Sequence, residues 1–162
     1  MRTNLLLITS FLLMFSCEIE SQEEEIHGCC DELAWNFNPE ATHHTEDTDS
    51  STCIYNFEFS NPTSDSQWIT GDDQTISWTG GDSNLNLSIF IVNEEEYANE
   101  ELGTPIEENV PNTGTYSWAV GIDQVGDKRI CFVQDINSDI TIDTINDLIT
   151  YSNEFSIIEQ AE

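Results

Sequence analysis

Between residues 109 and 120 the chain passes from a turn-forming segment directly into a segment of alternating side chains. Asn109–Gly114 contains Pro and Gly, and Tyr116–Val120 alternates large apolar with small residues. Turn residues followed by alternation with a period of two indicate a half-buried antiparallel strand. The same pattern recurs elsewhere in the chain, so this feature predicts an all-β fold.

Six segments carry the alternation or are rich in strand-forming residues, and turn residues separate them. Short strands at this spacing are typical of an antiparallel β-sandwich. Glu94–Leu102 reads as either a short helix or an acidic loop, and Asn137–Leu148 as a loop or a weak edge strand. The predicted strands are Tyr55–Phe59, Thr75–Trp78, Leu85–Val92, Thr115–Val120, Arg129–Gln134 and Asn153–Ile158.

The first 17 residues have the pattern of an export signal rather than of a folded domain. Arg2 gives a positive start, Leu5–Phe15 is apolar, and Ser16 precedes Cys17. This apolar run is short for a membrane span. The segment resembles a bacterial lipoprotein signal, in which Cys17 becomes the lipidated first residue and anchors the protein to the membrane. The alternative is an ordinary signal peptide with cleavage nearby.

The chain is strongly acidic, with 32 Asp plus Glu and a formal net charge of −29. Without the signal, Lys128 and Arg129 are the remaining Lys and Arg residues. Such a chain repels nucleic-acid phosphates, which excludes nucleic acid as a partner class. The acidity fits either a calcium or other cationic partner or adaptation to salty surroundings. We read residues 18–26, which include three consecutive Glu, as a flexible acidic tether.

About 145 residues follow the signal, enough for one small sandwich plus a minor module. Residues 56–160 form the larger unit. Its order of motifs resembles the Ser/Thr-rich, GPI-anchored Kre9/Knh1-like family of extracellular domains. The resemblance implies an immunoglobulin-like β-sandwich on a cell surface, without catalytic residues, that serves adhesion, assembly or polysaccharide contact. It rests on Asn61-Pro62, Trp68, Gly71, Ile76–Trp78, Asn109–Val120 and Tyr151–Ile157.

Three tryptophans of the larger unit are either core residues or platforms for a sugar ring. Trp78 and Trp118 are in phase with apolar neighbours on their strands, which favours the core. Trp68 precedes a turn at Gly71 and is the best candidate for an exposed aromatic that stacks on a ligand.

Residues 27–55 form a second unit, rich in polar residues and poor in aliphatic ones. Such a segment cannot build its own core and needs a covalent link. Gly28–Ala41 and the later Cys53 resemble a short cysteine-bracketed module of secreted Bacteroidetes proteins. The resemblance implies a loop closed by a Cys29–Cys53 disulfide. The chain departs from the usual pattern at Cys30, where Thr is common.

Five cysteines are present, and four remain if Cys17 carries lipid. An even number in an exported chain favours disulfides. With Cys29 and Cys53 paired as the resemblance implies, Cys30 and Cys131 are left to join the module to the sandwich. The alternative is that Cys131 is a buried apolar thiol.

Oxygen-bearing side chains in the module suggest a calcium site. Ca²⁺ binds several carboxylate and amide oxygens that converge from a turn. The alternative is that these residues build turns by bonding to their own backbone. Adjacent His43 and His44 could bind a transition metal or lie on the surface without fixed geometry. The candidate calcium ligands are Asp31, Asn36, Asn38, Asp47 and Asp49.

The sequence therefore favours a non-enzymatic lipoprotein of the outer membrane or cell surface, with polysaccharide or another surface protein as its partner. The first alternative is a calcium-binding surface protein that acts through the module. A hydrolase is the weaker alternative, because the chain has no Gly-x-Ser-x-Gly motif and its three His residues all lie outside residues 56–160.

Overall fold

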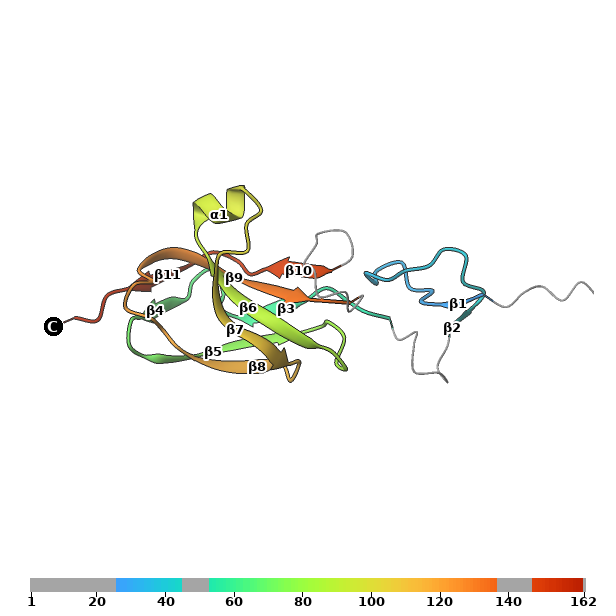
Figure 1. Ribbon diagram of the computed structural model, residues 1–162, viewed down its shortest axis with the longest axis horizontal. Helices are drawn as coiled ribbons and strands as arrows, with labels where there is room; N and C mark the ends of the chain where they lie inside the picture. The colour runs from blue at the N-terminus through green and yellow to red at the C-terminus, as the bar shows by residue number, and fades with distance from the viewer. Residues whose placement is uncertain (1–25, 45–52, 137–146, 162) are drawn as a thin grey trace, which may run out of the picture.

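The computed structural model describes residues 26–44, 53–136 and 147–161, which form a small module and a β-sandwich. The module lies at one end of the sandwich and the C-terminus at the other (Figure 1). The larger sheet has the order β4 (Gln67–Ile69), β11 (Phe155–Ile158), β9 (Gly126–Gln134), β6 (Asn86–Val92) and β7 (Thr104–Pro111), and β10 (Leu148–Tyr151) also pairs with β9. The smaller sheet has the order β3 (Glu58–Asn61), β5 (Asp73–Thr79) and β8 (Thr115–Ala119).

The main core lies between the two sheets and follows the predicted alternation. Ile76 and Trp78 of β5 face Ile130 and Phe132 of β9, and all four are buried. The ring of Phe132 lies 4.7 Å from that of Trp78 and 5.2 Å from that of Phe57, between ring centroids. Burial of each such side chain stabilises the fold by about 1.5–3 kcal/mol. The predicted immunoglobulin-like sandwich is confirmed.

Three strands of the sandwich, β4, β7 and β10, were not predicted, and β4 depends on a partner distant in sequence. β4 pairs in parallel with β11, about ninety residues later, so the larger sheet is not antiparallel throughout. β10 pairs with β9, and β7 pairs with β6. A segment as short as β4 carries no period of its own, so its pairing is visible only in the assembled sheet.

The turn predicted at Asn109–Gly114 is shorter than expected. Residues 109–111 belong to β7, where Val110 pairs with Leu87 of β6. One extra residue in β7 makes a bulge, and Asn109 takes a left-handed φ of 60° there. The turn itself is left to the residues before Thr115, including Gly114 at φ 84°.

The module is held by turns and one disulfide rather than by a core. Its short strands β1 (His27–Gly28) and β2 (His43–His44) pair in parallel. Cys29 and Ala34 are its buried apolar side chains among residues 26–44. At the junction, Ile54 belongs to the sandwich core, yet its backbone N–H donates to Asn36 Oδ1 and its carbonyl accepts from Trp35 N.

The segment after β6 forms a short helix, α1 (Glu94–Ala98), which decides between the two expectations for it. Asn93 caps the helix by accepting from Glu96 N, and the Glu96 carboxylate accepts from Asn93 N. This reciprocal pair satisfies donors that would otherwise lack partners. Figure 1 shows α1 on the outside of the larger sheet, on the side opposite the smaller sheet.

Candidate functional site

The larger sheet is covered on its outer face as well as its inner one. The last four residues of β6 and the last five of β9 are buried in unbroken runs. Phe90 and Val92 from β6 and Cys131 and Val133 from β9 form a second apolar cluster. Such runs arise when both faces of a strand are covered. Here the cover includes Leu102 after α1 and the side chains of β10.

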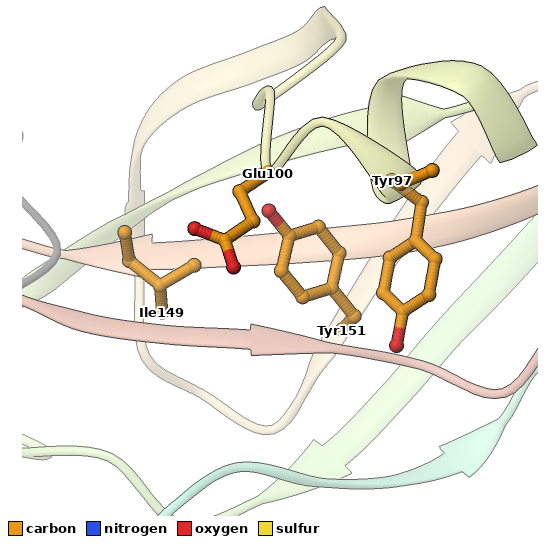
Figure 2. A pocket seen from close by; sticks show the side chains of 5 residues that line it. Tyr97, Glu100, Ile149 and Tyr151 are labelled. Atoms are coloured by element: carbon orange, nitrogen blue, oxygen red, sulfur yellow. The ribbon is translucent and has the colours of Figure 1, made fainter.

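A pocket of about 540 Å³ opens between α1 and β10 on this outer face. Tyr97, Ala98 and Glu100 line it from the helix and its end, and Ile149 and Tyr151 line it from β10. Figure 2 shows the rings of Tyr97 and Tyr151 beside one another, with the Glu100 carboxylate between Ile149 and Tyr151. The two ring centroids lie 5.1 Å apart with the planes at 78°, an edge-to-face pair.

Glu100 stands at a position that favours glycine. Glu101 N donates to Glu96 O and Glu100 N to Tyr97 O, which is the Schellman arrangement that ends a helix. The residue after the C-cap then takes a left-handed conformation, and Glu100 has φ 58°. For a residue with a Cβ this conformation costs about 1 kcal/mol relative to glycine. The strained backbone sends a carboxylate into the pocket.

A guanidinium group packs against Tyr97, one of the residues that line the pocket. Arg129 Cζ is 4.3 Å from the centroid of the Tyr97 ring, and the Arg129 side chain is 20% exposed. Its Nη2 atom lies 3.4 Å from Glu154 Oε2 and 3.8 Å from Glu94 Oε2. The positive charge of Arg129 is therefore balanced by two carboxylates, and it occupies one face of Tyr97.

The floor of the pocket is neutral at physiological pH. Burial raises the pKa of Tyr151, and with the smaller contributions of the adjacent Cys131 and the Glu100 carboxylate it reaches about 12. Burial also raises the pKa of the Cys131 thiol to about 12, although a hydrogen bond with Tyr151 opposes that shift. The hydroxyl and the thiol both keep their protons, so Glu100 supplies the charge among the lining residues.

Trp68 does not form the predicted ligand platform. It is 3% exposed, and its ring lies 4.5 Å from that of Phe155 and 6.0 Å from that of Trp118, between centroids. The parallel pairing of β4 with β11 turns this side chain into the core. The prediction that Trp68 is exposed for sugar stacking is therefore wrong.

The disulfide that the module resemblance implied is formed, but the second predicted disulfide is not. Cys29 and Cys53 are joined with an S–S distance of 2.07 Å, which confirms that disulfide. Cys30 is an exposed free thiol in the module, and Cys131 is a buried free thiol in the outer-face cluster. The predicted Cys30–Cys131 link is wrong, because Cys131 is covered by the side chains of β10. Cys17 lies outside the described residues.

Three of the five candidate calcium ligands use their oxygens in the module itself. Asp31 Oδ1 accepts from Leu33 N and its Oδ2 from the Tyr55 hydroxyl. Asn36 Oδ1 accepts from Ile54 N, and Asn38 Oδ1 from Glu40 N. These are the turn-building bonds of the alternative interpretation. Asp47 and Asp49 lie outside the described residues, so calcium binding stays a prediction.

The described residues include no group of three or more His, Cys, Asp or Glu side chains placed to hold a metal ion. Over the same residues, no helix is long and apolar enough to span a membrane.

Sequence reasoning missed the pocket and all the residues that line it. Tyr97 and Glu100 belong to a segment that read as helix or acidic loop, and Ile149 and Tyr151 to a strand that was not predicted. A left-handed Glu at a helix end has no distinctive sequence pattern. The sequence did contain one indication, since both faces of β6 carry apolar residues. Phe90 and Val92 therefore had to be covered by another segment of the chain.

The residues of the sandwich match a known family of domains. The model of the Kre9/KNH-like N-terminal Ig-like domain matches residues 61–157, more than half of the chain. A fibronectin(III)-like module of CbhA from Clostridium thermocellum is similar to this chain, with 11% identity and a TM-score of 0.42. That match covers 64% of this chain and 98% of the module. No curated protein sequence matches the chain. The chain thus belongs to the Kre9/KNH-like family of Ig-like domains.

Proposed function

We propose that this protein is an exported, lipid-anchored and non-enzymatic surface protein whose sandwich contacts a polysaccharide or another surface protein. The observation that carries the proposal is the Cys29–Cys53 disulfide at the base of a Kre9/KNH-like sandwich. Disulfides persist in oxidising compartments, and small modules without a core depend on them. Export is therefore consistent with what holds the module together.

The order of the segments supports an anchored arrangement. Cys17 follows the apolar run, an acidic stretch separates it from the module, and the module precedes the sandwich. With two or more acyl chains on Cys17, attachment to the membrane is stable. The acidic stretch then sets the sandwich away from the lipid surface.

A non-enzymatic role fits the family and the fold. Immunoglobulin-like sandwiches of this kind are typically binding or spacer modules, and their ligand contacts lie on sheet faces and loops. Within residues 56–160 the sequence contains no His, the residue that most often serves as a general base. The pocket between α1 and β10 offers rings and a carboxylate, a set suited to binding.

Metabolic labelling with an alkyne-tagged fatty acid tests the anchor in the full chain. We expect label in the wild type and in Cys30→Ser, and none in Cys17→Ser, which would be released as a soluble protein. Label retained in Cys17→Ser would contradict the anchor. Protease treatment of intact cells then asks whether the sandwich faces outward.

A glycan array with the soluble Cys17→Ser chain tests the contact role. Binding of a defined polysaccharide class would identify the ligand. If the array shows no binding, cross-linking on intact cells asks instead for a protein partner. Failure of both would leave the sandwich without the proposed contact role.

A further inference from the structure

We infer that the pocket between α1 and β10 is a binding site for an alkylammonium group, such as a quaternary amine or a lysine side chain. The site consists of the Tyr97 and Tyr151 rings, the Glu100 carboxylate and Ile149 (Figure 2). This goes beyond the proposed surface role and does not depend on the lipid anchor.

The composition of the pocket matches an organic cation. The face of an aromatic ring attracts a cation, and a nearby carboxylate adds a direct ion pair. Tyr97 already demonstrates this affinity, because the Arg129 guanidinium lies 4.3 Å from its centroid. The alkyl part of the ligand would pack on Ile149, and the volume of about 540 Å³ accommodates a choline-sized group.

The carboxylate of Glu100 is available for such a ligand. Among the described residues it forms no hydrogen bond or ion pair, and it lines the pocket. Its backbone is held at φ 58°, where glycine would be relaxed. Left-handed residues of this kind concentrate at ligand-binding positions, where strain is part of the function.

The charge of the protein favours a cation over a neutral or anionic ligand. The formal net charge is −29, and α1 alone contributes Glu94, Glu95 and Glu96. Arg129 opposes this locally, but Glu94 and Glu154 balance its charge. A surface of this sign raises the local concentration of cations and speeds their association.

Nuclear magnetic resonance titration of the Cys17→Ser chain tests the site with defined probes. Choline represents a quaternary amine, and Nα-acetyl-lysine amide represents the primary amine of a lysine side chain. Their relative affinities show which of the two ligands the site prefers. The neutral controls are 3,3-dimethylbutan-1-ol, which has the shape of choline without its charge, and glucose. We expect ring signals of Tyr97 and Tyr151 to shift with an amine and at least tenfold weaker binding of the neutral isostere.

Variants at one helix end separate binding from folding. Glu100→Gln should weaken amine binding at least tenfold, whereas Glu101→Gln, which removes the same charge outside the pocket, should leave it within twofold. Glu100→Gly should also abolish binding while raising the melting temperature by roughly 2–5 °C, because the left-handed strain is relieved. Glu100 would then raise the affinity for amines and lower the stability of the fold.

Three outcomes would overturn the inference. The first is equal affinity for choline and its neutral isostere, which would make the pocket merely apolar. The second is preferential binding of glucose at the same ring signals, which would make it a sugar site. The third is no shift of either tyrosine with any amine up to high millimolar concentration.

Discussion

The module and the sandwich are built from one chain but are held together by different physical means. In the sandwich, a continuous core from both sheets surrounds Phe132 and Ile76. In residues 26–44, two buried apolar side chains, a disulfide and several turn bonds replace such a core. The difference shows that the polar module depends on a covalent link, whereas the sandwich depends on burial.

The largest expected effect is on the sandwich core. Phe132→Ala removes a fully buried ring that contacts Phe57, Phe59 and Trp78, and should cost about 3–5 kcal/mol of unfolding free energy. Denaturant unfolding followed by tryptophan fluorescence measures it. The exposed Ile158→Ala on β11 serves as control, with a change within about 0.5 kcal/mol. Equal losses in both variants would mean that the core is not centred on Phe132.

Removal of the disulfide should act on the module alone. In the chain-entropy model, a link with a sequence separation of 24 contributes roughly 3 kcal/mol. Cys29→Ala with Cys53→Ala should therefore unfold residues 26–44, while the sandwich transition stays unchanged. Hydrogen exchange resolved by region measures this, with Cys30→Ala as control. Loss of the sandwich transition would show that the two regions fold as one unit.

Ile54→Ala should affect both regions, because its side chain is in the sandwich core and its backbone bonds to the module. The side chain is 7% exposed, so its truncation should cost the sandwich about 2 kcal/mol. Exchange protection in the module should fall as well, since Trp35 N and Asn36 Oδ1 bond to the Ile54 backbone. Tyr55→Phe, which removes the bond to Asp31, should disturb the module only. Unchanged protection in the module of Ile54→Ala would mean that the junction does not transmit stability.

Alkaline pH should destabilise the sandwich through the buried thiol of Cys131. The Cys131 thiol has an ordinary pKa of 9.0, and burial raises it to about 12 in the fold. The folded state thus holds this proton more tightly, so the contribution is intact below pH 9 and is lost as the pH rises toward 12. At pH 10 the loss is about 1.4 kcal/mol. Urea unfolding at pH 8 and pH 10 measures it. Cys131→Ala should lose most of this dependence, and an unchanged dependence would assign the effect to other groups.

The smallest effect concerns the two free thiols. Iodoacetamide should modify the exposed Cys30 rapidly and change the stability of either region by less than about 0.5 kcal/mol. Cys131 should react only after the sandwich unfolds, since the thiolate is the reactive form and is suppressed by burial. Mass mapping of the alkylated peptides measures both rates. Rapid native-state labelling of Cys131 would show that the outer-face cluster opens readily.

Local sequence patterns predicted much of the fold but little of the candidate site. Trp78 and Ile89 reached the core as expected, because period-two alternation directly reflects which face of a strand is buried. Trp68 was misplaced because its exposure is decided by β11, which lies far along the chain. Tyr97, Glu100 and Tyr151 meet for the same reason, since α1 and β10 contact only once the larger sheet has formed.

The sequence by itself determined the class of the fold and the acidic character of the protein, and it predicted a division into module and sandwich. These follow from local alternation, turn residues and composition, which act over a few residues or over the chain as a whole. Only the tertiary structure decided which strand edges pair, which tryptophan is buried, and which thiols stay apart. It also placed a strained Glu100 beside two tyrosines, because contacts between distant segments depend on the packing of the complete sheets.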